Sequence, residues 1–410
     1  MSDALHDGWR AAVAIIESLR SAGYVALLAG GCVRDRLLEC EPKDYDVATD
    51  ATPPQVLALY PRGRKVGAKF GVVLVRKFGQ QVEVATFRTE GRYSDGRHPD
   101  EVAFGTEIED ARRRDFTING IFLDPIGDRI IDHVGGQADL AAKIVRTIGD
   151  PDRRFGEDHL RMLRAVRFAA GLSFQLDAAT LRSIQRFADC LLRISPERIA
   201  QELERILTGP RRAVGWSLLL ETGLRDHLAA AWPAAADDDA AAGRRLAALP
   251  DRDLPFGLAL AAVLVGCGQR QAGEICRALR LSNSVSRCVA WMIASLPAVG
   301  DADLLEPADL KSLMASPNWD YLPDLLGADL SARDAELRPY HRLRERAAAI
   351  DPDAISPPPL LTGDELTSLG LPPGPRMGAI LQAVYRAQLN ERISTRGQAL
   401  AMAEELMRQP

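Results

Sequence analysis

Two aspartates near the start of the chain have the type and spacing to hold a metal ion. Asp44 and Asp46 lie one residue apart in the segment PKDYDVAT, residues 42–49. Alternate side chains of a β-strand share a face, so the two carboxylates would point the same way. Mg²⁺ prefers such hard oxygen ligands and would neutralise their repulsion. A solvated strand end is the alternative, and the rest of the chain must decide between the two.

A third carboxylate, Glu83, lies in the segment QVEVATFR, whose alternating β-branched residues predict a strand. Placed between Val82 and Val84, Glu83 would be able to face the same way as the aspartates. Two metal ions held by such a set would activate an attacking hydroxyl and shield a nucleoside triphosphate. A solvent-facing strand residue without a chemical role is the alternative.

A glycine pair precedes the aspartates in the segment LAGGCVRD. Gly30 and Gly31 would allow the backbone to approach a phosphate closely, and Arg34 would pair with phosphate oxygens. A plain tight turn also explains two adjacent glycines. Their position shortly before the aspartate pair favours the phosphate site.

Polar residues follow three consecutive arginines in the segment RRRDFTING, residues 112–120. Asp115 and Asn119, which come after Arg114, are able to hold a ribose or a triphosphate. The alternative places Asp115 at a helix cap and leaves Asn119 exposed.

A basic helix is predicted from the segment RRFGEDHLRMLRAVRF, residues 153–168. Helical spacing places Arg161, Arg164 and Arg167 within about a third of the circumference. Asp158 precedes Arg161 by three residues. The pair is either an ordinary surface ion pair or a set of fixed donors and acceptors for a base edge.

The composition sets limits on partners and compartment. The chain has 410 residues, of which 47% are hydrophobic and 26% charged, and its net charge is −5. A nucleic-acid-binding surface must therefore be local. The six cysteines show no C-x-x-C pair and no zinc spacing, which indicates free thiols in a reduced compartment.

No segment indicates secretion or a membrane. Residues 1–24 predict an amphipathic helix rather than a signal peptide. The longest apolar run, residues 254–268, is too short to cross a bilayer and predicts a buried helix. We therefore expect a cytoplasmic protein with no membrane association and no obligate protein partner.

The element pattern predicts an α+β fold, with a mixed head of strands and helices followed by an all-helical remainder. Strand patterns end before about residue 148, and helical periodicity dominates afterwards. Residues 229–245 predict a low-complexity loop or linker, and residues 351–361 a proline-stiffened joint. The expected parts are a catalytic head at 1–148, a base-recognition neck at 149–210, a body at 211–345 and an RNA-binding tail at 346–410.

Five motifs recur in order between about residues 22 and 210: GGCVRD, KDYDVAT, RRDFTINGIF, DHVGG and GDPDRRFGEDHLRMLRAVRFA. This series resembles the class II tRNA nucleotidyltransferase and bacterial poly(A) polymerase family, part of the polymerase-beta superfamily. The C-terminal half resembles, more weakly, the helical body and tail of some bacterial CCA-adding enzymes. The segment LLTGDELTSLGLPPGPRMGAIL is the most similar part of it.

The resemblance implies a role for each motif residue. Asp44 and Asp46 would bind catalytic Mg²⁺, and Gly31 and Arg34 would contact the triphosphate. Arg114 and Asp115, helped by Asn119, would serve phosphate or ribose recognition. Asp158 and Arg161 would recognise the base. Arg164 and Arg167 would complete the nucleotide pocket.

The chemistry of the bases agrees with a template made of Asp158 and Arg161. Cytosine and adenine each present an amino donor beside a ring-nitrogen acceptor, which match an Asp acceptor and an Arg donor. Uracil and guanine would leave the carboxylate unpaired, at a cost of about 1–3 kcal/mol. The resemblance therefore implies CCA addition to the 3′ end of tRNA from CTP and ATP, without a nucleic-acid template and with release of pyrophosphate.

Related activities remain as alternatives. Ala68, after Gly67 and before Lys69, departs from the pair of basic residues typical of poly(A) polymerases. Residues 86–104 resemble the flexible loop of complete CCA-adding enzymes, which A-adding enzymes also keep. An A-adding enzyme or a poly(A) polymerase is therefore the main alternative. A non-catalytic RNA-binding protein would require damaged carboxylates, and a second-messenger synthase would not require the long helical half.

Overall fold

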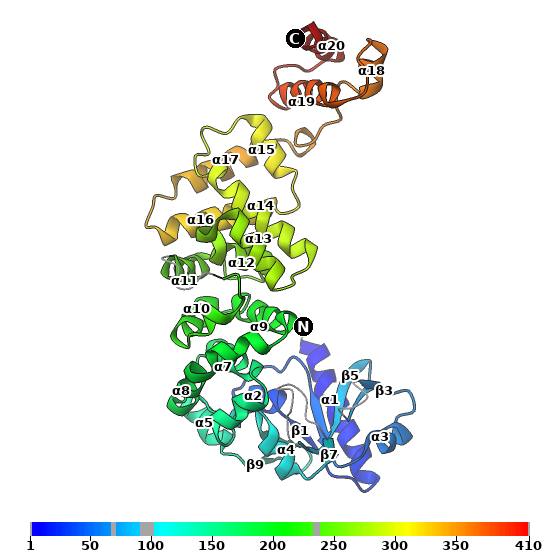
Figure 1. The fold of residues 1–410 in the computed structure, drawn as a ribbon. Helices are drawn as coiled ribbons and strands as arrows, with labels where there is room; N and C mark the ends of the chain where they lie inside the picture. The colour runs from blue at the N-terminus through cyan, green and yellow to red at the C-terminus, as the bar shows by residue number, and fades with distance from the viewer. Residues whose placement is uncertain (1, 67–70, 91–101, 233–237, 409–410) are drawn as a thin grey trace. The chain divides into compact units, whose positions relative to one another are not determined.

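The computed structural model describes residues 2–66, 71–90, 102–232 and 238–408. The chain forms two compact units, Met1–Trp232 and Pro233–Pro410 (Figure 1). Each is described by itself. The predicted α+β fold, a mixed head followed by helices, is confirmed. The division into head, neck, body and tail at residues 148, 210 and 345 stays a prediction.

A seven-stranded mixed sheet is the framework of the first unit, with strand order β3-β4-β5-β2-β1-β8-β9. Only the β2–β5 pair is parallel within this sheet, and the other neighbours are antiparallel. The strands are β1 (Ala26–Ala29), β2 (Asp46–Thr49), β3 (Arg64–Val66), β4 (Val72–Lys77), β5 (Gln80–Thr86), β8 (Ile121–Asp124) and β9 (Arg129–Asp132). Two short two-stranded pairs lie outside it, formed by β6 (Arg88–Glu90) with β7 (Val102–Phe104) and by β10 (Ile144–Val145) with β11 (Gln175–Leu176).

The alternating apolar patterns form the strands that they predict. β4 and β5 make an antiparallel hairpin. Its turn lies at Phe78 and Gly79, whose φ angles are 49° and 77°. A two-residue turn with both φ angles positive matches the twist of the flanking strands, so Gln80 already pairs within β5.

Helices cover the sheet. The predicted amphipathic helix α1 (Ser2–Ser21) packs on β1, β2, β4 and β5 and buries Ile15, Ile16 and Leu19. A core cluster including Phe87, Ala111 and Phe122 joins the sheet to α4 (Glu107–Arg113). The other helical elements before residue 150 are α2 (Gly31–Leu37), α3 (Pro53–Leu59), the 3₁₀ helix η1 (Thr117–Asn119) and α5 (Gly136–Ala142).

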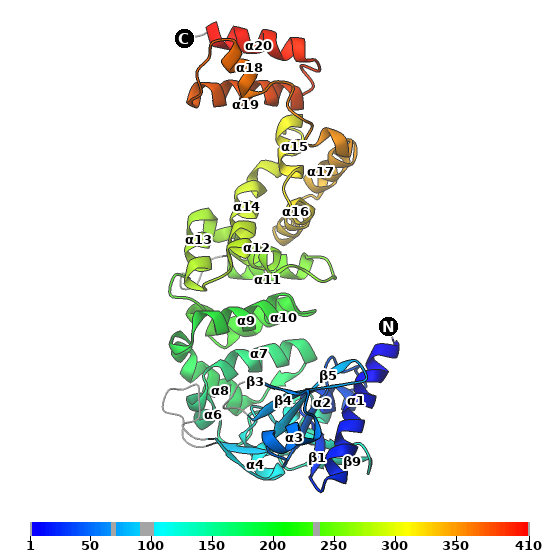
Figure 2. The same cartoon turned by 90° about the vertical axis from the view of Figure 1, so that its right-hand side faces the viewer.

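Helices α7, α9 and α10 run side by side and complete the first unit (Figure 2). The basic segment forms α6 (Pro151–Glu157) and α7 (Leu160–Leu172), and Met162, Val166 and Ala169 are buried as helical spacing predicts. Helix α9 (Pro196–Leu207) has proline in its first turn, where the missing backbone N–H is tolerated. The remaining elements are α8 (Ala178–Phe187), η2 (Ala188–Arg193), α10 (Arg212–Glu221) and η3 (Leu224–His227).

In the described residues of the second unit, all the regular secondary structure is helical. The linker prediction for 229–245 is wrong in part, because α11 (Asp239–Ala248) begins inside that segment, while residues 233–237 lie outside the described residues. The apolar run forms α12 (Phe256–Leu264), all of whose residues are buried. The other helices are α13 (Gly268–Ala278), α14 (Asn283–Val299), α15 (Pro307–Met314), α16 (Leu322–Ala332), α17 (Arg338–Ala348), α18 (Gly363–Ser368), α19 (Pro375–Leu389) and α20 (Arg396–Arg408), with 3₁₀ turns η4 (Val265–Cys267), η5 (Trp319–Tyr321) and η6 (Pro352–Ala354).

The last three helices share a small core of their own, which includes Leu366, Met377, Ile380 and Ala403. Pro375 opens α19, a position that suits its fixed φ and missing N–H. All six cysteines are free thiols. None of the described helices has both the length and the apolar character that crossing a bilayer demands.

Candidate active site

The carboxylates meet where β2 begins. Parallel pairing places Asp46 directly opposite Glu83 of β5. The next pair, Val47 and Val84, is buried, so Asp46 and Glu83 lie on the other face of their strands. This confirms the expected placement of Glu83. Its role in metal binding stays a prediction.

The placement of Asp44 differs from the expectation. The residue is exposed and lies in a bend, and the strand begins only at Asp46. The neighbouring strand β1 ends at Ala29 and turns into α2 at Gly30, so it offers Asp44 no partner for strand pairing. The prediction that both aspartates share a strand face is therefore wrong for Asp44, although its charge still acts on Asp46.

The donor set fits a divalent cation. The pKa of the Asp46 carboxyl is raised to about 6, chiefly by burial and then by the negative charge of Glu83, with Asp44 adding to it and Arg114 opposing it. Within the described residues, no group of three His, Cys, Asp or Glu side chains is arranged to hold a metal alone. Mg²⁺ is commonly bound by one or two carboxylates with substrate phosphates and waters. The site therefore fits an ion whose coordination the nucleotide completes.

The raised pKa makes a prediction about stability. Between the pKa of an unfolded aspartate, about 3.9, and the folded value of about 6, the folded protein binds more protons than the unfolded chain. The free energy of unfolding therefore falls as pH rises through this window. Above the window, the full destabilisation by the buried, ionised Asp46 remains. In a chelating buffer, we expect Asp46→Asn to increase the free energy of unfolding at pH 8 by about 1–3 kcal/mol. Thermal melts at pH 8 and pH 4.5 would test this, and a variant no more stable than the parent at pH 8 would contradict it.

The glycine pair, Arg34 and Arg114 form one cluster. Gly30 has a φ of 73°, and a Cβ there would lie only 2.9 Å from Nη1 of Arg114. Gly31 begins α2, and one turn later the buried Arg34 donates from Nη1 to Oδ1 of Asn119 at 2.7 Å. Arg114 also lowers the pKa of Asp46, so the carboxylates and the arginines belong to one site.

Arg114 has a carboxylate partner that sequence reasoning missed. Its Nε and Nη2 donate to Oδ2 of the buried Asp110 at 3.1 and 2.9 Å, and its Nη1 donates to the carbonyl of Asn119 at 3.2 Å. Burial raises the pKa of Asp110, but Arg114 and Arg113 outweigh it and hold the pKa below its ordinary value. Asp110 therefore stays ionised and orients Arg114.

Asp115 joins the sheet-bearing part of the unit to α7. It accepts from Nδ2 of Asn119 at 3.1 Å and from Nε and Nη2 of Arg164 at 2.8 and 2.6 Å. Burial alone would raise its pKa, but Arg164 overcomes this and the net pKa is about 2. The alternatives of a helix cap for Asp115 and an exposed Asn119 are wrong, because Asn119 is buried and α4 ends at Arg113.

Asp158 and Arg161, for which a surface ion pair was one of two alternatives, are held by different partners. Asp158 caps the end of α6, accepts from the backbone N–H of Leu160 at 3.0 Å and accepts from Arg198 of α9 at 2.9 Å. Arg161 is buried and donates to Glu157 at 2.8 Å. The chain leaves helical geometry at Asp158, whose φ is −150° and ψ 105°, so helical spacing does not apply across this point.

Arg167 and Glu202 face each other across α7 and α9. The Nε of Arg167 lies 3.2 Å from Oε2 of Glu202, which is 3% exposed. Arg164 lies 3.9 Å from the same carboxylate, and Arg205 lies at 3.1 Å. Glu202 is therefore the shared counter-ion of Arg164, Arg167 and Arg205. Its spacing with Ile199, Leu203 and Ile206 on the apolar face of α9 is the sequence signal that could have found it.

Some sequence predictions lie outside the described residues. They concern Gly67, Ala68 and Lys69, and the central part of the loop at 86–104 with Asp95, Gly96 and Arg97. The pairing of β6 with β7 brings the two described ends of that loop together.

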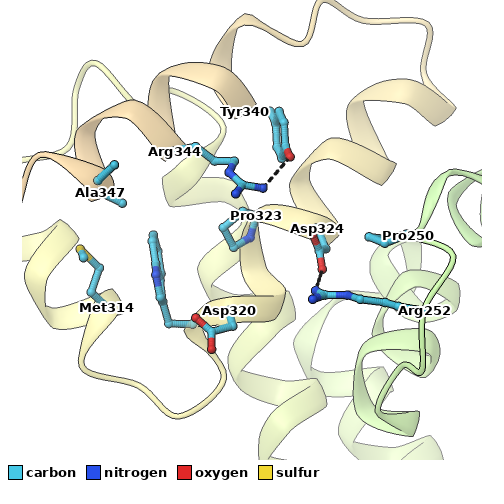
Figure 3. A pocket seen from close by; sticks show the side chains of 11 residues that line it. Pro250, Arg252, Met314, Asp320, Pro323, Asp324, Tyr340, Arg344 and Ala347 are labelled. Atoms are coloured by element: carbon cyan, nitrogen blue, oxygen red, sulfur yellow. Dashed lines mark hydrogen bonds and ion pairs between the residues drawn. The ribbon is translucent and has the colours of Figure 1, made fainter.

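A separate cavity of about 700 Å³ lies in the second unit (Figure 3). It contains none of the predicted site residues. Three of the charged groups that line it have partners within the lining, since Arg252 pairs with Asp324 and Arg344 donates to the hydroxyl of Tyr340 at 3.0 Å. Nothing in this lining selects a ligand.

Comparisons with known proteins identify the family of this chain. The family described as Poly A polymerase head domain matches residues 26–146, and a family described as probable RNA and SrmB-binding site of polymerase A matches residues 173–236. The CCA-adding enzyme of Geobacillus thermodenitrificans (strain NG80-2) is 37% identical over 398 residues, which cover 92% of each chain. This chain belongs to the family of CCA-adding enzymes.

Other members of the CCA-adding enzyme family support the assignment along the whole chain. The enzyme of Geobacillus stearothermophilus is 35% identical over 382 residues, or 92% of each chain. A crystal structure of the Bacillus stearothermophilus CCA-adding enzyme in complex with CTP is 31% identical, with a TM-score of 0.80 and coverage of 97% of both chains. The resemblance identified from the five motifs is confirmed.

Proposed function

We propose that this protein adds the sequence CCA to the 3′ end of tRNA, using CTP and ATP and releasing pyrophosphate. The observation that carries the proposal is the match along 92% of a CCA-adding enzyme, together with an intact Asp44, Asp46 and Arg114 cluster. The related crystal structure in complex with CTP adds support for nucleotide binding.

In the proposed reaction, the terminal hydroxyl of the RNA attacks the α-phosphate of the bound nucleotide, and the bond to pyrophosphate breaks. Asp44 and Asp46 would hold Mg²⁺, with Glu83 as a further candidate ligand. When bound, the ions supply activation of the hydroxyl and stabilisation of charge on the phosphates. Arg34 and Arg114 would bind the triphosphate beside Gly30 and Gly31.

Base selection would fall to Asp158 and Arg161. Both side chains are held by protein partners, Arg198 and Glu157, which fix their orientation before a nucleotide arrives. Asp158 would accept from the amino group of cytosine or adenine, and Arg161 would donate to the ring nitrogen beside it. Arg164 and Arg167, with Asp115 and Asn119, would complete the pocket.

The test uses tRNA that ends at the discriminator base, supplied with CTP alone, ATP alone and then both. Two C additions followed by a single A would support the proposal. Addition of A only to a CC end would replace it with an A-adding activity, and a long A tract would replace it with a tailing activity. No incorporation from either nucleotide would overturn the enzymatic assignment.

The base-template role makes a further prediction. We expect Arg161→Ala to raise the misincorporation of UTP relative to CTP by about 10-fold, because the change removes a donor worth about 1–3 kcal/mol of discrimination. Competition between the two nucleotides in single-turnover reactions would measure it. Arg153→Ala is the matched control, since Arg153 lies on α6 with an 82% exposed side chain. Unchanged selectivity in a folded Arg161→Ala protein would remove Arg161 from the template.

A further inference from the structure

One aromatic ring lies among three arginines of the site. The guanidinium carbons of Arg34, Arg164 and Arg167 lie 5.2, 5.4 and 4.6 Å from the ring centroid of Phe168. Arg34 belongs to α2, whereas the other two belong to α7 with Phe168 itself. The fully buried Phe116 packs against this ring in a T-shaped arrangement, with ring centroids 5.7 Å apart and an interplanar angle of 75°.

The ring adds an attraction to the interactions that hold the three arginines. An aromatic face attracts a guanidinium within about 6 Å, and the attraction grows where water is excluded. Each arginine also has a carboxylate partner, which is Asp35 for Arg34, Asp115 for Arg164 and Glu202 for Arg167. Those partners are three different side chains, whereas the ring of Phe168 lies within cation–π distance of all three arginines.

Arg167 depends most on the ring. Its Nε and Oε2 of Glu202 are buried and 3.2 Å apart, but neither atom has a hydrogen-bond partner. Burial lowers the pKa of Arg167 to about 10, with Glu202 opposing this effect and Arg164 adding to it. Contact with Phe168 at 4.6 Å, the shortest of the three, therefore positions a guanidinium that its carboxylate does not orient.

The ring also provides a second connection between α2 and α7. The first is the chain of hydrogen bonds from Arg34 through Asn119 and Asp115 to Arg164. That chain fixes Arg164 but includes neither Arg167 nor any other part of α7. The ring of Phe168 contacts Arg34 as well as Arg164 and Arg167.

We propose that Phe168 is a positioning residue that holds Arg34, Arg164 and Arg167 together around the bound nucleotide. The inference rests on the proposed function, because the arginines bind a nucleotide only if that function holds. Phe168 acts through the arginines and contributes no donor or acceptor of its own.

The test measures nucleotide binding apart from chemistry. Phe168→Leu keeps an apolar side chain against Phe116 but removes the aromatic face. We expect the dissociation constant for CTP to rise by about 3- to 30-fold, which corresponds to the loss of cation–π contacts at a partly buried ring. Because the arginines bind the nucleotide before the chemical step, KM should rise while kcat changes less. Phe168→Tyr keeps the ring and should restore affinity.

A series of fluorinated phenylalanines at position 168 separates electrostatics from packing. Each added fluorine weakens the attraction of the ring for a cation while the shape is nearly kept. CTP affinity should fall stepwise along the series, with unchanged thermal stability. Phe174→Leu, which removes a buried ring just beyond α7, is the control for lost packing and should leave the affinity near that of the parent.

The outcomes distinguish this inference from the proposed function. If the parent protein binds CTP and extends tRNA, but affinity is the same in Phe168→Leu and flat along the fluorinated series, the positioning role of Phe168 is wrong and the proposed function stands. If the parent binds no nucleotide, both are wrong. A stepwise loss of affinity in proteins of equal stability supports the inference.

Discussion

Asp46→Asn should reduce the single-turnover rate of nucleotide addition by about 1,000-fold or more. The substitution removes the carboxylate at the centre of the cluster, opposite Glu83 and close to Arg114. Charge stabilisation by a bound ion is worth several kcal/mol, and each 1.4 kcal/mol changes a rate by about 10-fold. The same variant is expected to be more stable than the parent at pH 8, so loss of activity would not be a consequence of unfolding.

Rapid-quench assays with tRNA lacking its final nucleotides would measure the rate. Asp128→Asn is the matched control, because Asp128 is an exposed aspartate of the same unit with a φ of 44°, which asparagine tolerates. Glu83→Gln, measured in parallel, would test the third carboxylate. A rate within 10-fold of the parent for Asp46→Asn would rule out Asp46 as a ligand of the catalytic ion.

Asp115→Ala should destabilise the first unit by about 3–5 kcal/mol. The change leaves Arg164 without its bidentate carboxylate and Asn119 without an acceptor for its amide. Breaking a buried ion pair from one side costs this much because the remaining charge is uncompensated. Asp7→Ala removes the partner of Arg10, whose side chain is 59% exposed, and should cost less than about 1 kcal/mol.

Hydrogen exchange resolved by peptide suits this comparison because the chain has two units. Peptides from α7 and from Thr117–Asn119 should lose protection in Asp115→Ala, whereas peptides from residues 238–408 serve as a reference within the same molecule. Equal protection of α7 in the parent and the Asp115→Ala variant would show that this contact does not stabilise the unit.

Local sequence patterns were sufficient to predict most helices and strands and part of the site. The alternation around Glu83 predicts a strand and its facing, and β5 has both. Helix α1 was likewise predicted, from the amphipathic pattern of residues 1–24. These features depend on residues within a few positions of one another, which is the range over which periodicity and capping act.

Partners that lie far apart in the sequence were not predictable in the same way. Asp158 pairs with Arg198, forty residues later, and Asp115 pairs with Arg164. Local spacing suggested instead a pair of Asp158 with Arg161, which the break between α6 and α7 prevents. Phe168 was visible within a motif, but only the folded chain brings Arg34 to its ring.

The pairing of β1 with β8 has a consequence for how the protein is made. Leu28 and Ala29 pair in register with Leu123 and Phe122, so β1 waits for a segment translated more than ninety residues later. A nascent chain halted on the ribosome before Ile121 would expose one edge of β1. The β1–β8 side of the sheet must therefore await synthesis of β8, and until then this edge is open to pairing with another strand.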